Sequence, residues 1–404
     1  MKKIDAPRRE KGTGTLWQDD KGKWHLRREI GPNPKTGKRR FVTAIAATKT
    51  EAREKLNRKI EELQAEGTLA FETIPTLEQY TQRWLNSIRA QIKPRVFKAY
   101  ESEINQINQQ IGRLPLDQLT SSHIEYALAL LSQKRSSKTI HNYYIRIRQI
   151  LTQAVQEKLI PINPAYQMRP PRYIIKETTI LQPGQPAQAL TTLKNATFKP
   201  NTALALADDE EKEMWDLMWH LAFETGMRQA ERFGLTPSEL VTQDGIHGIQ
   251  VTHQLQRLTK DAFIPNWLPT THIQGSYYLL PPKTKQGKRF IPISTQLWIG
   301  LNQQIQQNHT QQNQLIFTLN GQPLNSQKER RRWQQTLQAA GLPYTTMRAA
   351  RHFFSTQLAQ IGASEDARIS MMGHAKITTT AGYTHWTPAA LAQLADQARQ
   401  AVTQ

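Results

Sequence analysis

The segment MMGHAKITTTAGYTHW, residues 371–386, gathers chemically able side chains near the end of a 404-residue chain. It holds a Gly-His pair at Gly373-His374, a tyrosine nine residues later at Tyr383, and a Thr-His pair directly behind that tyrosine. Aliphatic residues are sparse in it, so a packed core does not explain the segment. A surplus of polar side chains without a core needs an explanation from the rest of the sequence.

The chain as a whole is strongly basic. Its formal net charge is +20 and its pI is about 10.0. Residues 1–50 carry 14 Lys or Arg against 5 Asp or Glu, a net charge of +9. The expected partner is therefore a polyanion, and nucleic acid is the first choice. Composition alone leaves open a soluble protein that is merely basic.

Several other classes of protein are disfavoured by the sequence. No run approaches the roughly 18 apolar residues that span a bilayer, and no signal peptide is expected because the basic start lacks an apolar stretch. The chain has no cysteine, which excludes disulfides and thiolate chemistry and fits the cytoplasm. There is no Gly-rich phosphate loop and no His or Asp cluster at metal-ligand spacing, so we expect neither a cofactor nor a metal.

Residues 1–68 are expected to form a small basic module. GTLWQDDKGKWHLRREIG, residues 14–31, alternates like two strands around an Asp-Asp-Lys-Gly turn, with a third strand at 39–45 and a helix at 50–64. Such a sheet can read DNA by lying in a groove, and a solvated charged face is the alternative. The candidate DNA contacts are Trp24, Arg27, Arg39 and Arg40.

Residues 73–172 are expected to be helical throughout. Apolar side chains recur at helical spacing in four stretches, and the third of them is expected to be capped by Ser121 or Ser122. These stripes predict the core of a four-helix domain. The polar faces retain basic side chains suited to phosphate contacts, namely Lys138, Arg146 and Arg148.

Residues 176–404 combine helices with a small antiparallel sheet, so the whole chain is predicted to be multidomain α+β. A long helical stretch is EEKEMWDLMWHLAFETG, residues 210–226. Strands are expected at 248–255, 277–280 and 289–293, and residues 257–275 have no assignment. The last stretch, residues 387–402, reads as a helix with an Ala and Leu face.

Three further motifs in this third part could handle a phosphate group. TGMRQAERFGL, residues 225–235, places Arg228 at a helix end with Glu231 three residues on, so that the carboxylate can brace the guanidinium. PPKTKQGKRFIPIS, residues 281–294, reads as a lysine-rich hairpin turn, and MRAARHFFSTQL, residues 347–358, presents Arg351 opposite an apolar face. Taken alone, each motif also fits an ordinary surface ion pair, turn or helix.

The order of these motifs is more specific than any of them alone. Arg with Glu, a lysine hairpin, Arg-His, Gly-His and Tyr-Thr-His together resemble the tyrosine recombinases, the phage-integrase family, of temperate-phage and conjugative-transposon type. The resemblance covers most of the chain. It implies an arm-type DNA-binding domain at 1–68, a core-binding domain at 73–172 that includes LIPINPA (159–165), and a catalytic domain at 176–404.

The resemblance also implies a reaction, in which a tyrosine hydroxyl cuts DNA and forms a 3′-phosphotyrosyl link. Tyr383 is then the nucleophile, Arg228 and Arg351 hold the nonbridging oxygens, His374 donates a hydrogen bond to the phosphate, and the hairpin Lys283 is the general acid. Supporting roles are expected for Glu231, Arg348, Lys285 (the alternative hairpin lysine) and His385. Arg348 is a departure, because the family usually has His or Lys three residues before its second arginine, and an arginine cannot act as a base.

The expected function is therefore site-specific recombination that integrates, and also excises, a phage or mobile element in a bacterial host. Expected partners are core-type and arm-type DNA sites, a homotetramer on two duplexes, a host bending protein and an excisionase, with the protein on the nucleoid. Two alternatives stay open from the sequence. One is a non-catalytic DNA-binding or regulatory protein on the same fold, and the other is a type IB topoisomerase-like activity.

Overall fold

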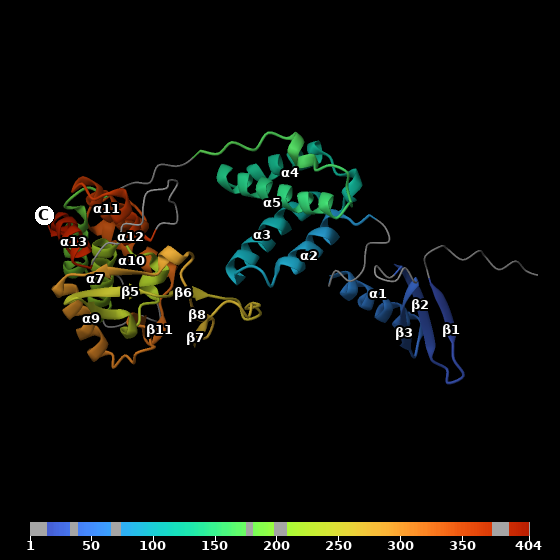
Figure 1. The fold of residues 1–404 in the computed structure, drawn as a ribbon, viewed down its shortest axis with the longest axis horizontal. Helices are drawn as coiled ribbons and strands as arrows, with labels where there is room; N and C mark the ends of the chain where they lie inside the picture. The colour runs from blue at the N-terminus through green and yellow to red at the C-terminus, as the bar shows by residue number, and fades with distance from the viewer. Residues whose placement is uncertain are drawn as a thin grey trace, which may run out of the picture. The chain divides into compact units, whose positions relative to one another are not determined.

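A computed structural model describes residues 14–32, 39–65, 74–174, 181–197, 208–373 and 388–403 (Figure 1). Contacts divide the chain into two compact units. The first comprises residues 1–175 with 263–265, and the second comprises residues 176–262 with 266–404. The division into three domains, at residues 1–68, 73–172 and 176–404, stays a prediction.

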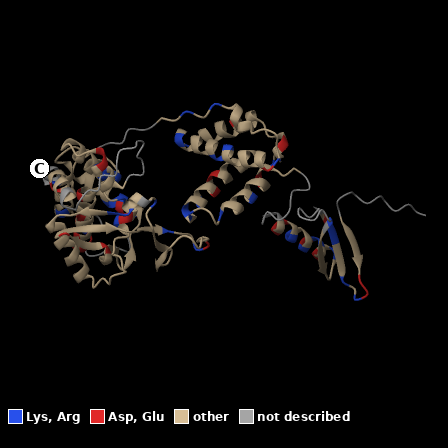
Figure 2. Ribbon diagram, viewed as in Figure 1, with Lys and Arg blue, Asp and Glu red and all other residues tan. Residues whose placement is uncertain are grey.

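The first unit opens with a three-stranded antiparallel sheet in the order β1-β2-β3, followed by α1. The elements are β1 (Thr15–Gln18), β2 (Trp24–Pro32), β3 (Arg39–Ala46) and α1 (Lys49–Ala65). One face of the sheet buries Leu26 and Val42 against Leu56 of the helix. This confirms the predicted sheet-plus-helix module. Basic residues lie on β2 and along α1, where acidic ones alternate with them (Figure 2).

Four α-helices follow in the same unit, as predicted. They are α2 (Leu77–Ile88), α3 (Pro94–Ile111), α4 (Ser121–Ser132) and α5 (Ser137–Gln156). Their apolar stripes meet in one core around Tyr80, Trp84 and Tyr144. The cap of α4 differs from the prediction: Thr120, not Ser121 or Ser122, accepts from the backbone N–H of His123. The helix begins one residue earlier because Thr120 is the last residue with extended backbone.

The second unit is mainly helical. Its helices are α6 (Gln185–Asn195), α7 (Asp208–Thr225), α8 (Gln229–Phe233), α9 (Thr295–Gln307), α10 (Ser326–Ala339), α11 (Arg348–Gln360), α12 (Glu365–Met372) and α13 (Pro388–Thr403). The core is rich in aromatic rings, with Trp219 of α7 edge-on to Trp333 of α10 and Phe223 edge-on to Phe353 of α11. These contacts join α7, α10 and α11 into one block, which positions the arginines of the site.

The described residues of this unit also form two three-stranded antiparallel sheets and a short pair, β10 (Thr318–Leu319) with β11 (Gln322–Pro323). The sheet β4-β5-β9 is made of Leu240–Gln243, Ile246–Val251 and Arg289–Pro292, and the sheet β6-β8-β7 of Gln254–Arg257, Tyr277–Leu280 and Thr271–Gln274. The single strand predicted at 248–255 is wrong, because the chain leaves one sheet after Val251 and enters the other at Gln254. The unassigned stretch 257–275 contains β7.

The last helix, α13, packs against α7, α11 and β9 of its own chain. Leu391, Ala395 and Ala398 form a buried cluster with Phe354 and Met372. Arg399 adds polar contacts, since its side chain lies 3.3 Å from Glu224 and donates from Nη2 to the carbonyl of Pro292 over 2.6 Å. The Ala and Leu face read from the sequence is thus covered within the chain.

Candidate active site

The first arginine of the site lies at the junction of two helices. The chain leaves α7 at Gly226, whose φ of +59° favours glycine, and Arg228 is the N-cap of α8. Glu231 accepts from the backbone N–H of Arg228 over 2.9 Å and from its Nη1 over 2.7 Å. This is the bracing contact that the spacing of the two residues predicts.

The second arginine reaches the same place from α11. Arg351 donates from Nη1 to the carbonyl of Gly226 over 2.7 Å and from Nη2 to the carbonyl of Met372. Arg228 donates from Nη2 to the carbonyl of the next residue, Gly373, over 2.7 Å. Two guanidiniums from distant helices therefore meet at consecutive carbonyls at the end of α12.

The end of α12 is shaped for this contact. Gly373 is left-handed, with φ of +63°, and a Cβ there would lie 2.9 Å from the carbonyl oxygen of Gln286 and 3.1 Å from the side chain of Arg289. Glycine at this position lets the loop 281–288, which follows β8, approach the helix end closely. The three predicted residues that follow, His374, Tyr383 and His385, lie outside the described residues.

A buried arginine that sequence reasoning did not select, Arg289, completes the cluster. It is 6% exposed and donates from Nη2 to Glu231 over 2.9 Å, from Nε to the carbonyl of Met371 over 2.8 Å, and from Nη1 to the carbonyl of Gly287 over 2.9 Å. The signal for it was the alternation of β9, which places Arg289 on the same side as the buried Ile291.

The charges of the site are unbalanced. Burial would raise the pKa of Glu231, but the charges and hydrogen bonds of Arg289 and Arg228 outweigh it and hold the pKa below 4.5. Burial, and then the charges of Arg228 and Arg289, lower the pKa of Arg351 to about 9. One carboxylate thus faces three guanidiniums, an arrangement that an anion would stabilise.

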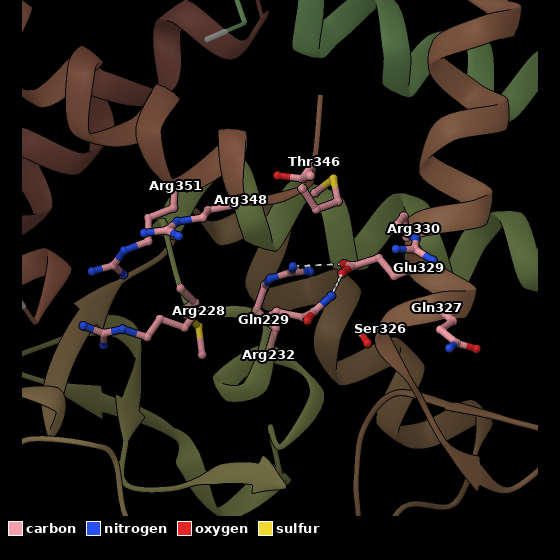
Figure 3. Close-up of a pocket in the computed structure, with 12 residues that line it drawn as sticks. Arg228, Gln229, Arg232, Ser326, Gln327, Glu329, Arg330, Thr346, Arg348 and Arg351 are labelled. Atoms are coloured by element: carbon pink, nitrogen blue, oxygen red, sulfur yellow. Dashed lines mark hydrogen bonds and ion pairs between the residues drawn. The ribbon is translucent and has the colours of Figure 1, made fainter. Parts of the chain in front are cut away.

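A cavity of about 580 Å³ opens beside these arginines. Arg228, Arg348 and Arg351 line one side of it, and Arg330 of α10 lines the other (Figure 3). At its back, Arg232 lies 2.9 Å from Glu329, and both side chains are almost completely buried. This pair ties α8 to α10 and so supports the cationic wall. Among the described residues, no cluster of three or more His, Asp or Glu side chains is placed to bind a metal ion.

The predicted lysine hairpin is wrong, because β8 pairs with β6 and β7 whereas β9 pairs with β5, so that residues 281–288 form a loop between two sheets. This lysine loop follows β8 and contains a short 3₁₀ helix, Lys285–Gly287. Lys283 is exposed at its start, and the side chain of Lys285 is outside the described parts. The turn is fixed at both ends, because Gln254 donates to the carbonyl of Pro281 and the amide of Gly287 donates to the carbonyl of Thr284. The choice of Lys283 over Lys285 as the general acid stays a prediction.

The predicted DNA contacts of the small sheet fall on different faces. Arg27 and Arg39 are exposed, and the guanidinium of Arg27 stacks 3.8 Å from the ring of Phe41. Trp24 instead packs against the module's core, with Lys49 4.4 Å from its ring. The side chain of Arg40 is outside the described parts. Trp17, exposed and stacked on His25, lies on the open face and was not selected.

The predicted contacts of the four-helix part also differ from one another. Lys138 is exposed, 3.8 Å from the ring of Tyr173, and Arg148 lies 5.5 Å from the ring of Tyr166. Arg146 is buried, donates from Nε to Glu103 over 2.9 Å, and covers the ring of Tyr100. This packing argues for a structural role for Arg146, because its charge is already paired. Contact with DNA stays a prediction for all three residues.

Comparison with known proteins gives two family matches. The family described as "Phage integrase family" matches residues 198–389, and "Phage integrase, N-terminal SAM-like domain" matches residues 76–128. The chain is similar to a XerC-like tyrosine recombinase of Caldanaerobacter subterraneus, with 24% identity over 84% of this chain and 87% of the relative. It is also similar to the transposase of transposon Tn916 from Enterococcus faecalis, with 23% identity over 68% and 65% of the two chains.

Solved structures share the fold. One is the Tn1549 transposon integrase in complex with circular intermediate DNA, at 22% identity, with a TM-score of 0.59 over 78% of this chain and 97% of that one. Another is a lambda integrase tetramer bound to a Holliday junction, at 16% identity, with a TM-score of 0.53 over 92% and 98%. No helix in the described parts of the chain is long and apolar enough to cross a membrane.

Proposed function

The chain belongs to the phage integrase family of tyrosine recombinases, and from that premise we propose that it is a site-specific DNA recombinase that cuts and rejoins DNA through a 3′-phosphotyrosyl intermediate. The observation that carries the proposal is the meeting of Arg228 and Arg351 at the carbonyls of Gly373 and Met372. It holds two forked cations directly before His374, where the nonbridging oxygens of one phosphate would bind.

The proposed reaction uses these residues as follows. The hydroxyl oxygen of Tyr383 attacks the scissile phosphorus, a Tyr–O–P bond forms and the bond from phosphorus to the 5′-oxygen breaks. Lys283 gives its proton to the leaving 5′-oxygen, and His374 donates a hydrogen bond to the phosphate. A phenol has a pKa of about 10 and is a weak nucleophile at neutral pH, so stabilisation of the charged transition state by Arg228 and Arg351 is essential.

Arg348 stands where the family usually has His or Lys. It lines the cationic cavity together with Arg351, so it adds positive charge near the phosphate. An arginine does not accept a proton at working pH. The proton of Tyr383 therefore passes to solvent in this proposal, and no general base is assigned.

The biological role proposed is integration and excision of a phage or transposon in a bacterial cell. Support comes from the names of the relatives, which include transposon proteins and an integrase bound to circular intermediate DNA. Residues 1–68 would bind arm-type sites through the exposed face of the sheet, which carries Arg27, and residues 73–172 would bind core-type sites.

The active assembly proposed is a homotetramer on two duplexes, by analogy with the lambda integrase tetramer. A host DNA-bending protein and an excisionase are the further partners proposed, because arm and core sites on one DNA must be brought together and the direction of exchange controlled. The protein would work at the nucleoid, where its substrate lies.

The test is cleavage of a nicked suicide substrate that carries the element's core site. The wild-type protein should form a covalent protein–DNA adduct, and Tyr383→Phe should form none while it still binds the site. Tyr344→Phe is the matched control, since Tyr344 is 49% exposed and lies outside the site. Cleavage by the Tyr383→Phe protein would show that the nucleophile is wrongly assigned.

The same assay separates the two alternatives. A non-catalytic DNA-binding protein would give no adduct with the wild type at any attachment site. A topoisomerase-like enzyme would relax plasmid DNA without a specific sequence. Neither is favoured by the family match.

A further inference from the structure

Arg289 differs from the two predicted phosphate ligands in how its guanidinium is used. All three of its nitrogens donate to the protein, to Glu231, Met371 and Gly287. Its side chain is 4% exposed, whereas that of Arg228, which shares Glu231, is 36% exposed. Arg228 can therefore reach an external phosphate, and Arg289 is enclosed by protein groups.

We propose that Arg289 is a positioning residue that holds the lysine loop, residues 281–288, and the end of α12 in register with the Arg228–Glu231 pair. This inference rests on the function proposed above and adds a residue to it. Arg289 would touch no DNA, and it would act through Lys283 and His374.

The first link runs from Arg289 to the lysine loop. The carbonyl of Gly287, which accepts from Nη1 of Arg289, belongs to the residue whose amide closes the turn onto Thr284. Gly287 also lies against Pro282, since a Cβ at Gly287 would come within 2.5 Å of the proline ring. Lys283 stands between Pro282 and Thr284. A shift of Gly287 would therefore displace Lys283 as well.

The second link runs to α12. Nε of Arg289 donates to the carbonyl of Met371, and the side chain of Arg289 lies next to the position that a Cβ of Gly373 would occupy. The three consecutive residues 371–373 thus accept from Arg289, Arg351 and Arg228 in turn. The cations also suit the negative end of the helix dipole. His374 follows this anchored end directly.

The third link makes the other two cooperative. Glu231 accepts from both Arg228 and Arg289, so one buried carboxylate joins the exposed phosphate ligand to the enclosed guanidinium. The lysine loop, the end of α12 and Arg228 are then held by one set of hydrogen bonds around Glu231 and Arg289. A general acid must lie within hydrogen-bond reach of the leaving oxygen, and a displacement of about 1 Å can cost about 100-fold in rate.

The main experiment compares Arg289→Lys with wild type on two DNA substrates, one normal and one with sulfur in place of the bridging 5′-oxygen at the cleavage site. A thiolate leaves without a proton, because thiols have a pKa near 8.5, so this substrate bypasses the general acid. We expect Arg289→Lys to cleave normal DNA about 100-fold more slowly and the sulfur substrate far less slowly. Lys283→Ala should show the same pattern of rescue.

Arg332→Lys is the matched control. Arg332 is 5% exposed and pairs with Glu211 of α7 over 2.8 Å. Its variant should keep the wild-type ratio of the two cleavage rates even if it is less stable. The proposal is overturned if Arg289→Lys cleaves normal DNA at the wild-type rate, or if it is slowed as much on the sulfur substrate as on normal DNA while Lys283→Ala is rescued.

A second measurement needs no activity. The amides of Gly287 and Gly373 donate to the carbonyls of Thr284 and Ile369, and both should exchange hydrogen faster in Arg289→Lys than in wild type or Arg332→Lys. Unchanged exchange would contradict the positioning role. If the wild type cleaves neither substrate, the proposed recombinase function fails. The hydrogen-exchange data still decide whether Arg289 holds the lysine loop in place.

Discussion

Arg228 donates from Nη2 to the carbonyl oxygen of Gly373 over 2.7 Å, across 145 residues of sequence. This bond places the start of α8 against the end of α12. It gives the guanidinium a fixed direction before any phosphate arrives, and preorganised donors of this kind are what stabilise a charged transition state. The cluster that forms around this bond, and the surfaces further from it, can each be tested by substitution.

Gly373→Ala should destabilise the protein. Alanine would have to adopt φ of +63°, at a cost of about 1–3 kcal/mol, and its Cβ would also meet Gln286 and Arg289. Gly362→Ala is the control, because Gly362 has φ of +77° and no atom lies within 4 Å of the place that its Cβ would occupy. Urea unfolding should show the larger loss for Gly373→Ala. Equal losses of unfolding free energy would mean that the close approach of the lysine loop to Gly373 contributes nothing to the effect of the substitution.

Glu231→Gln should cost about 3–5 kcal/mol of unfolding free energy, because it leaves the buried guanidinium of Arg289 without its carboxylate. Cleavage should slow as well, since Arg228 loses its brace. Glu101→Gln offers the contrast. Glu101 pairs with the exposed Lys98 three residues earlier on α3, and this pair should contribute at most about 1 kcal/mol. A cost for Glu231→Gln no larger than that of Glu101→Gln would argue against the cluster.

Lowering the pH should remove the contribution of Glu231 to the free energy of unfolding. Its pKa in the folded protein is held below 4.5, so its stabilising effect is fully present above 4.5 and is lost as pH falls through the lowered value. The difference in unfolding free energy between wild type and Glu231→Gln should therefore shrink as pH drops below 4.5. Chemical denaturation across a pH series measures it, and a difference that grows on acidification would have the wrong sign.

His352 should titrate at lower pH than an ordinary histidine. Burial, and then the charges of Arg348 and Arg351, lower its pKa below 6.5. Arg348→Ala should raise the pKa of His352, and NMR titration of the ring can measure the change. Arg330→Ala, on the opposite side of the cavity, should leave the pKa of His352 unchanged. No change on removing Arg348 would show that its charge lies too far from the ring.

Alanine substitution should weaken DNA binding at Lys138 and lower protein stability at Arg146. Lys138→Ala should weaken binding to core-site DNA and reduce the dependence of log affinity on log salt by about 1, because one phosphate contact is lost. Arg146→Ala should mainly lower stability, since it breaks the pair with Glu103 and uncovers Tyr100. If Arg146→Ala reduces the salt dependence as Lys138→Ala does, its guanidinium contacts DNA despite this packing.

Helical spacing, turn residues and motif order were enough to predict the broad fold and the family from the sequence. The four-helix core around Trp84 and Tyr144 follows from apolar periodicity, because a stripe at that spacing can be buried only on one side of a helix. The pairing of Arg228 with Glu231 follows from a separation of three residues, which is local geometry. The packing of Trp24 against the core does not follow from the strand alone, because the strand does not determine which face of β2 meets α1.

Only the tertiary structure decided which charges remain available for a ligand. Arg146 and Arg289 look like surface cations in sequence, yet packing encloses both and pairs them with Glu103 and Glu231. The meeting of Arg351 and Arg228 at Met372 and Gly373 depends on how α7, α11 and α12 pack together. Contacts between residues more than a hundred positions apart have no local signature. Sequence spacing therefore determined the helices and the contact between Arg228 and Glu231. Tertiary packing determined how Arg289 joins Glu231 to the end of α12 and to Gly287.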